Sequence, residues 1–133
     1  MNRVLVLATL IATLAMFSSH SASHSLADDA SSKVLRHVVM YKFKDTATPE
    51  QVQQVVDAFA GLPKMIDAII DFERGTNVSQ EGKSEGFTHV FVVTFKDEAG
   101  RDAYLKHPAH DAYVLVVKDK REKVVVFDYW AQK

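Results

Sequence analysis

The 133-residue sequence contains no cysteine, so no disulfide can brace the domain and no cysteine can carry a lipid anchor. It also lacks an excess of one charge, because 16 Lys and Arg stand against 17 Asp and Glu. Without a basic patch, nucleic acid is not an expected partner. A glycine-rich phosphate loop and a Ser-His-Asp signature are likewise absent. These absences exclude several common classes of binding and hydrolytic protein.

The N-terminal residues have the pattern of a secretory signal peptide. Met1-Asn2-Arg3 is short and positively charged, Val4 to Phe17 is an uncharged apolar run, and Ser25-Leu26-Ala27 offers small residues before a cleavage point. The apolar run is short against the roughly 20 residues needed to cross a bilayer as a helix. We therefore expect a signal peptide at 1–27, a secreted or periplasmic protein, and no stable membrane anchor after cleavage.

Cleavage after Ala27 would leave a short flexible leader at 28–33 and one domain at 34–131, and Ala22 is an alternative cleavage position. Loss of residues 1–27 removes Arg3 and no acid, so 15 basic residues remain against 17 acidic ones and the formal charge becomes -2. His20 and His24 belong to the cleaved segment 1–27 and are absent from the mature chain. A domain of this size is marginal and often gains stability by association.

Hydrophobic periodicity in the domain predicts the order strand, helix, two strands, helix, strand. The strands are expected at 34–44, 69–78, 87–95 and 124–130, with a solvated charged link at 118–123. A helix begins after Thr48, which can form a capping box with Gln51, and Pro49 suits the first helical position. A short helical turn is expected near 64–67. Asp97 caps another helix, which runs to about Leu105 and restarts at Pro108.

This order predicts an α+β fold, with a ferredoxin-like four-stranded antiparallel sheet and the helices on one face. The other face would then present Val and Phe side chains that no helix covers. An apolar surface of that kind needs a partner surface. We therefore expect a homodimer in which two sheets pack face to face as a dimeric α/β barrel.

Side chains that can take part in binding or catalysis cluster between Tyr104 and His110, where a phenol and two imidazoles flank Pro108. His37 and His89 stand near the starts of two apolar strands, and with His107 and His110 they complete the histidines of the mature chain. Metal is not expected, because no cysteine is present and the paired histidines straddle a proline.

The sequence resembles the stress-responsive dimeric α/β-barrel family. The resemblance rests on LRHVVMYKFK at 35–44, EGFTHV at 85–90, Tyr104 with HPAH at 107–110, and VFDY at 126–129. It implies a ferredoxin-like protomer and a homodimer. No cofactor is expected. In a plant member that cyclises a polyketide by aldol condensation, the catalytic pair matches Tyr104 and His110. The resemblance therefore implies that Tyr104 and His110 are the catalytic candidates. His37, His89 and His107 are the candidate pocket-lining residues.

Three functions remain open at this level. The first is an exported stress-response protein that binds a small apolar or aromatic ligand in a His/Tyr-lined pocket. The second is an aldol cyclase or lyase in which His110 is the general base and Tyr104 the orienting donor. The third is a structural oligomer without a ligand, in which His107 caps a helix, His110 locks the bend and Tyr104 is core. Haem degradation is supported by fold analogy alone.

Overall fold

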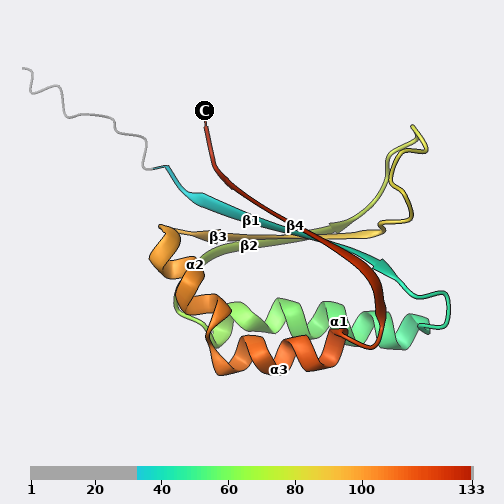
Figure 1. Ribbon diagram of the computed structural model, residues 1–133, viewed down its shortest axis with the longest axis horizontal. Helices are drawn as coiled ribbons and strands as arrows, with labels where there is room; N and C mark the ends of the chain where they lie inside the picture. The colour runs from blue at the N-terminus through green and yellow to red at the C-terminus, as the bar shows by residue number, and fades with distance from the viewer. Residues whose placement is uncertain (1–32, 133) are drawn as a thin grey trace, which may run out of the picture.

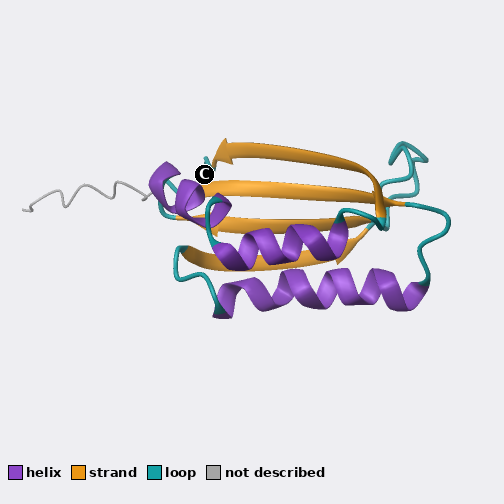
Figure 2. Cartoon of the chain, turned by 60° about the horizontal axis from the view of Figure 1, so that its bottom comes forward, coloured by secondary structure: helices purple, strands orange, loops and turns teal. Residues whose placement is uncertain are grey.

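The computed structural model describes residues 33–132, which form one antiparallel sheet covered by helices on a single face (Figures 1 and 2). The strands are β1 (Leu35–Phe43), β2 (Ile69–Thr76), β3 (His89–Phe95) and β4 (Arg121–Trp130). The helices are α1 (Pro49–Gly61), a 3-10 turn η1 (Leu62–Lys64), α2 (Glu98–Leu105) and α3 (Pro108–Val117). The strand order is β2-β3-β1-β4, which confirms the α+β, ferredoxin-like fold class.

The expected signal peptide at 1–27 and residues 28–32 of the expected leader lie outside the described residues. Of the helices within 33–132, none combines the length and apolar character needed to cross a membrane.

Side-chain caps start the helices where the sequence predicts. The Thr48 hydroxyl accepts a hydrogen bond from the Gln51 backbone N–H at 3.2 Å, and the Gln51 side chain accepts one from the Thr48 N–H at 3.0 Å. The Asp97 carboxylate accepts from the Gly100 N–H at 2.9 Å. Each cap satisfies backbone donors that a helix start leaves unpaired.

The core lies between the sheet and the helices. Along β1, every second side chain from Leu35 to Tyr41 is buried against the helices. Phe59 of α1 stacks on Phe91 of β3 with ring centroids 4.4 Å apart and reaches Tyr113 of α3 at 4.6 Å. These aromatic contacts pack α1 and α3 against the middle of the sheet.

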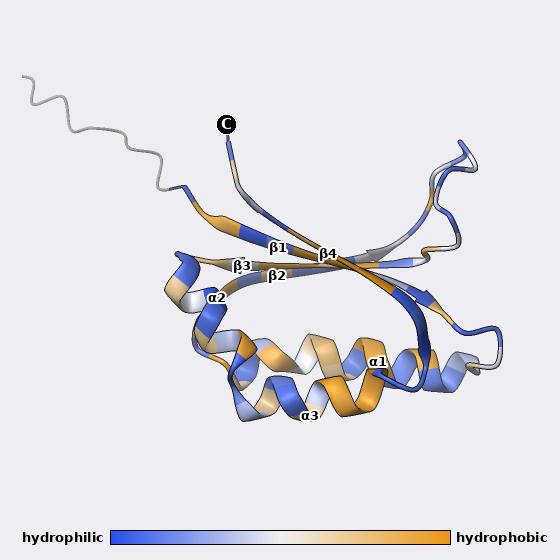
Figure 3. Ribbon diagram, in the orientation of Figure 1, coloured by the Kyte–Doolittle hydropathy of each residue, from blue (hydrophilic) through white to orange (hydrophobic). Residues whose placement is uncertain are grey.

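The opposite face of the sheet is covered by no described element. Val38 and Met40 of β1 pair there with Phe127 and Val125 of β4. The Phe127 side chain is 61% exposed, and β4 is coloured as strongly apolar through its centre in Figure 3. The sequence therefore predicted this bare apolar face correctly.

Several predicted boundaries were wrong, and the helical turn expected near 64–67 lies at Leu62–Lys64. β4 begins at Arg121 rather than at residue 124, β3 begins at His89 rather than 87, and β2 ends at Thr76 rather than 78. β4 is an edge strand, so charged side chains can join its ladder and still reach water. Lys42 accordingly pairs with Lys123 in register and its ammonium lies 3.1 Å from the Glu122 carboxylate. Charge alone was therefore a poor guide to where this strand starts.

Candidate functional site

A cavity of about 360 Å³ lies on the helix side of the sheet, between β1 and β4 on one wall and α2 and α3 on the other. It forms because the helices leave β4 partly uncovered: Val124 and Val126, which face the helix side, remain 37% and 54% exposed. The apolar lining residues are Val39, Phe59, Leu105, Val114, Val124 and Val126. The polar lining residues are His37, Tyr41, Tyr104, His110, Tyr113, Arg121 and Asp128.

His37 is held by a carboxylate on the neighbouring strand. The β1–β4 register places Asp128 directly opposite His37, and their Nδ1 and Oδ1 atoms are 2.6 Å apart. The second carboxylate oxygen accepts a hydrogen bond from Arg101 Nη1 of α2 at 3.2 Å. Since the His37 side chain is only 5% exposed, this chain of contacts fixes the orientation of a nearly buried imidazole.

Tyr104 and His110 come together across the break at Pro108. Their ring centroids are 4.6 Å apart, and the His37 ring centroid lies 5.5 Å from that of Tyr104. Burial is the main cause that raises the pKa of Tyr104 far above its usual value, so the phenol stays protonated and can only donate or accept as a neutral group.

His110 has the properties of a neutral base. Burial lowers its pKa, and the nearby His37 lowers it further, while Asp111 acts in the opposite direction. Its Nδ1 atom is enclosed and has no hydrogen-bond partner within residues 33–132. Leaving such an atom unpaired costs about 1–3 kcal/mol, which a ligand or an ordered water could recover.

A pair of phenols, Tyr41 and Tyr113, also lines the cavity, and the Tyr113 ring lies 6.5 Å from the His110 ring. The hydroxyls of Tyr41 and Tyr113 are 2.7 Å apart, and burial raises the pKa of both tyrosines. The guanidinium carbon of Arg121 lies 5.9 Å from the Tyr41 ring centroid, within cation–π range.

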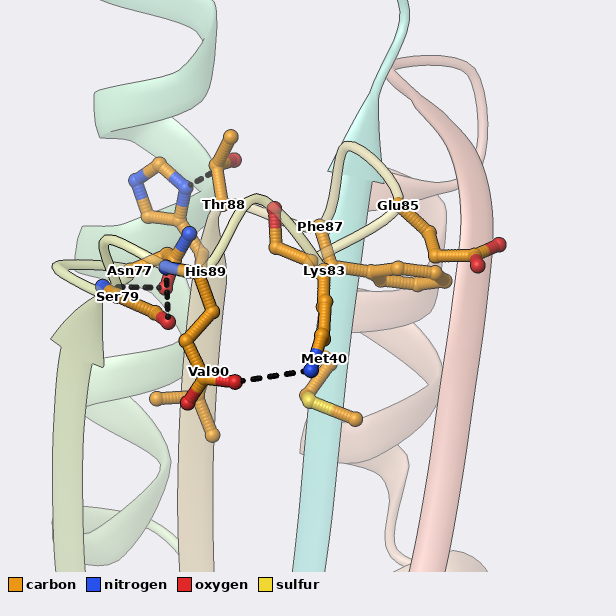
Figure 4. A pocket seen from close by; sticks show the side chains of 11 residues that line it. Met40, Asn77, Ser79, Lys83, Glu85, Phe87, Thr88, His89 and Val90 are labelled. Carbon is orange, nitrogen blue, oxygen red and sulfur yellow. Dashed lines mark hydrogen bonds and ion pairs between the residues drawn. The ribbon is translucent and has the colours of Figure 1, made fainter.

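The remaining two histidines do not line this cavity. His107 is the N-cap of α3, where its Nδ1 accepts a hydrogen bond from the Ala109 N–H at 3.0 Å. His89 lies at the other end of the sheet, where its Nδ1 and the Thr88 hydroxyl oxygen are 2.8 Å apart (Figure 4). It borders two other hollows, one under the loop at 77–88 and one beside α1.

His37 and His89 are separated because the sheet is antiparallel. His37 pairs with Val93 and His89 pairs with Tyr41, so each histidine sits near the start of a strand that runs the opposite way. The structure thus brings His37, Tyr104 and His110 together and leaves His89 and His107 outside.

Sequence reasoning missed Arg101, Asp128, Arg121, Tyr41 and Tyr113 as parts of the site. Of these five residues, Asp128 could have been predicted from the sequence, because a carboxylate in an otherwise apolar strand needs a polar partner. The register that supplies His37 as that partner is visible only in the fold. Within the described part of the chain, no group of three or more His, Asp or Glu residues is arranged to hold a metal ion.

The fold and the cavity together define the class: an α+β, ferredoxin-like protein with a small site between an edge strand and two helices. The chain belongs to the family of the stress responsive A/B barrel domain, whose model matches residues 35–131.

Two relatives and one solved structure illustrate this membership. The chain is 34% identical to olivetolic acid cyclase of Cannabis sativa, over 74% of this chain and 98% of that protein. It is 33% identical to the stress-response A/B barrel domain-containing protein HS1 of Arabidopsis thaliana, over 71% of this chain and 87% of that protein. A dimeric ferredoxin-like protein of unknown function from Thermobifida fusca superposes with a TM-score of 0.66 at 25% identity, covering 74% and 92% of the two chains.

Replacing His107 should separate a capping role from a pocket role. We predict that His107→Ala lowers the free energy of unfolding by about 1 kcal/mol, because α3 loses its N-cap, while His107→Asn retains most of it. Urea unfolding followed by circular dichroism measures both changes, with the exposed Lys106→Ala as control. Equal destabilisation by Ala and Asn would contradict the capping role.

Proposed function

We propose that this protein binds a small apolar or aromatic ligand in the cavity between β4 and α3. The observation that carries the proposal is the cavity itself: about 360 Å³, walled mainly by apolar side chains, with His37, Tyr104 and His110 meeting at one end. Ligand sites of small molecules have this size and this mixture of apolar wall and few polar groups.

The unpaired Nδ1 of His110 supports a ligand over a purely structural role. In a structural site, the fold would be expected to supply a partner for an enclosed polar atom. Here the neighbouring His37 and His107 each have one, from Asp128 and from the α3 backbone, while His110 Nδ1 has none within 33–132.

A second candidate function is cofactor-free aldol chemistry, of the cyclase or lyase type. An aldol step needs a base to remove a proton beside a carbonyl and a donor to stabilise the oxyanion that develops. His110, whose pKa is lowered by burial, suits the base, and the protonated Tyr104 hydroxyl suits the donor. The relative named olivetolic acid cyclase, matched over almost its whole length, favours this candidate over other enzyme classes.

The protein that carries out this function is proposed to be an exported homodimer. The N-terminal pattern at 1–27 supports secretion or transfer to the periplasm. The bare apolar sheet face supports a dimer, as does the dimeric relative from Thermobifida fusca. Packing two such faces together would remove Phe127 and its neighbours from water.

Blocking the cavity should abolish ligand binding. Alkylphenols and alkyl aryl ketones are suitable probes, and a ligand at 100 times its Kd adds about 2.7 kcal/mol of stability. For a domain of this size that raises Tm by roughly 10 °C or more. We expect Val126→Trp, which fills the cavity, to remove this shift, while Leu115→Trp on the exposed face of α3 retains it. The absence of any shift across both probe classes would sink the proposed binding function.

The aldol candidate predicts a particular pH dependence and a particular variant effect. With a linear polyketide thioester as substrate, turnover should rise with pH through a pKa below 6.5 and then level off, because only neutral His110 accepts a proton. Tyr104→Phe should lower kcat by about 10²–10³-fold, the loss of one oxyanion donor, without weakening substrate binding. Tyr129→Phe, on the opposite face, is the matched control. A kcat unchanged by Tyr104→Phe would exclude this mechanism.

Disrupting the bare sheet face should split the dimer. We predict that Phe127→Glu yields a monomer in sedimentation velocity, because the dimer would have to bury an unpaired carboxylate. Leu115→Glu, which places the same charge on an exposed helix position, should remain dimeric. If Phe127→Glu sediments like the wild type, the dimer does not use this face.

A further inference from the structure

The acid and the permanent cation that line the cavity are not paired with each other. Among its lining residues, Asp128 is the only acid and Arg121 the only residue with a permanent positive charge. The Asp128 carboxylate is already engaged on both oxygens, by His37 at 2.6 Å and by Arg101 at 3.2 Å. It is therefore committed to one end of the cavity and does not compensate Arg121.

Arg121 has no acidic partner of its own within residues 33–132. The carboxylates that form ion pairs there contact Arg36, His37, Lys42, Lys83 or Arg101. Glu122, the nearest acid in sequence, has its carboxylate 3.1 Å from Lys42 on the neighbouring strand. A guanidinium at the wall of a mostly apolar cavity, with no carboxylate beside it, remains able to bind an anion.

The surroundings of Arg121 fit an oxyanion. Arg121 lies over the Tyr41 ring, and the Tyr41 and Tyr113 hydroxyls are 2.7 Å apart. Since two phenols share one hydrogen bond, one hydroxyl hydrogen of the pair is left for another acceptor. A carboxylate could thus receive hydrogen bonds from both the guanidinium and a phenol.

The position of Arg121 also sets the shape of the ligand. Arg121 and Asp128 stand seven residues apart on β4, which separates their Cα atoms by roughly 20 Å. Val124 and Val126 line the cavity between them. Arg121 and the Asp128–His37 pair therefore lie toward opposite ends of the β4 wall of the cavity, and the Tyr113 ring, beside Tyr41, lies between Arg121 and His110 at 6.5 Å from the His110 ring.

We propose that Arg121 recognises the carboxylate of an elongated ligand whose apolar body lies along Val124 and Val126 toward His37, Tyr104 and His110. The ligand class is thus an alkyl or aryl carboxylic acid rather than a neutral apolar molecule. This inference rests on the proposed binding function and deepens it by naming the group that orients the ligand.

The test compares two probes of nearly the same size and shape, the anionic 4-butylbenzoate and the neutral 4-butylbenzamide, by isothermal titration calorimetry at pH 7.5. The wild-type protein should bind the benzoate at least tenfold more tightly, and this preference should shrink as salt is raised. Arg121→Gln should remove the preference while leaving the benzamide affinity within about twofold, because the apolar walls are unchanged. Lys123→Gln, which removes a charge from the opposite face of β4, should behave like the wild type.

Arg121→Lys provides a second variant, which retains the charge but loses the two-pronged geometry of the guanidinium, and should keep part of the preference. Equal binding of both probes by the wild type, or an unchanged preference in Arg121→Gln, overturns the role of Arg121 and leaves the binding function standing. If the wild type binds neither probe, nor any of the neutral phenols and ketones, the binding function itself fails, and this inference with it.

Discussion

The antiparallel pairing of β4 with β1 is the interaction on which the rest of the site depends. It places Asp128 opposite His37, so that a nearly buried imidazole gains a carboxylate partner at 2.6 Å. It also makes β4 the edge of the sheet, beyond the full cover of the helices. The cavity and the bare outer face both follow from this, because one strand has to serve as a wall on its helix side and as an apolar surface on the other.

Polar groups enclosed in this small domain are satisfied in pairs, and the exceptions are informative. His37 is matched by Asp128, Tyr41 by Tyr113, and His107 by the backbone of α3. At the cavity wall, the Nδ1 of His110 has no such protein partner within 33–132, and the guanidinium of Arg121 meets the Tyr41 ring but no carboxylate there. Because an unpaired polar atom and an uncompensated charge are both costly to enclose, these two groups mark where a ligand can contribute most.

The two histidines of the HPAH tract, three residues apart, have different structural roles. His107 precedes Pro108 with an extended backbone, so its ring turns back to cap α3. His110 sits one turn later on the helix and reaches Tyr104 of α2 across the break. Pro108 begins α3 after the break that follows α2, and across this break the Tyr104 and His110 ring centroids lie 4.6 Å apart.

Local patterns in the sequence determined the element order, the capping of α1, the break at Pro108 and the apolar outer face, because periodicity and caps act over a few neighbouring residues. Four motifs spread from residue 35 to 129 were enough to indicate the family. Only the tertiary structure decided which histidines meet. His37 joins Asp128 and Tyr104 while His89 lies at the far end of the sheet, since strand register and direction bring together residues up to 91 positions apart. Contacts over such separations depend on how the whole sheet is assembled, which no short stretch of sequence encodes.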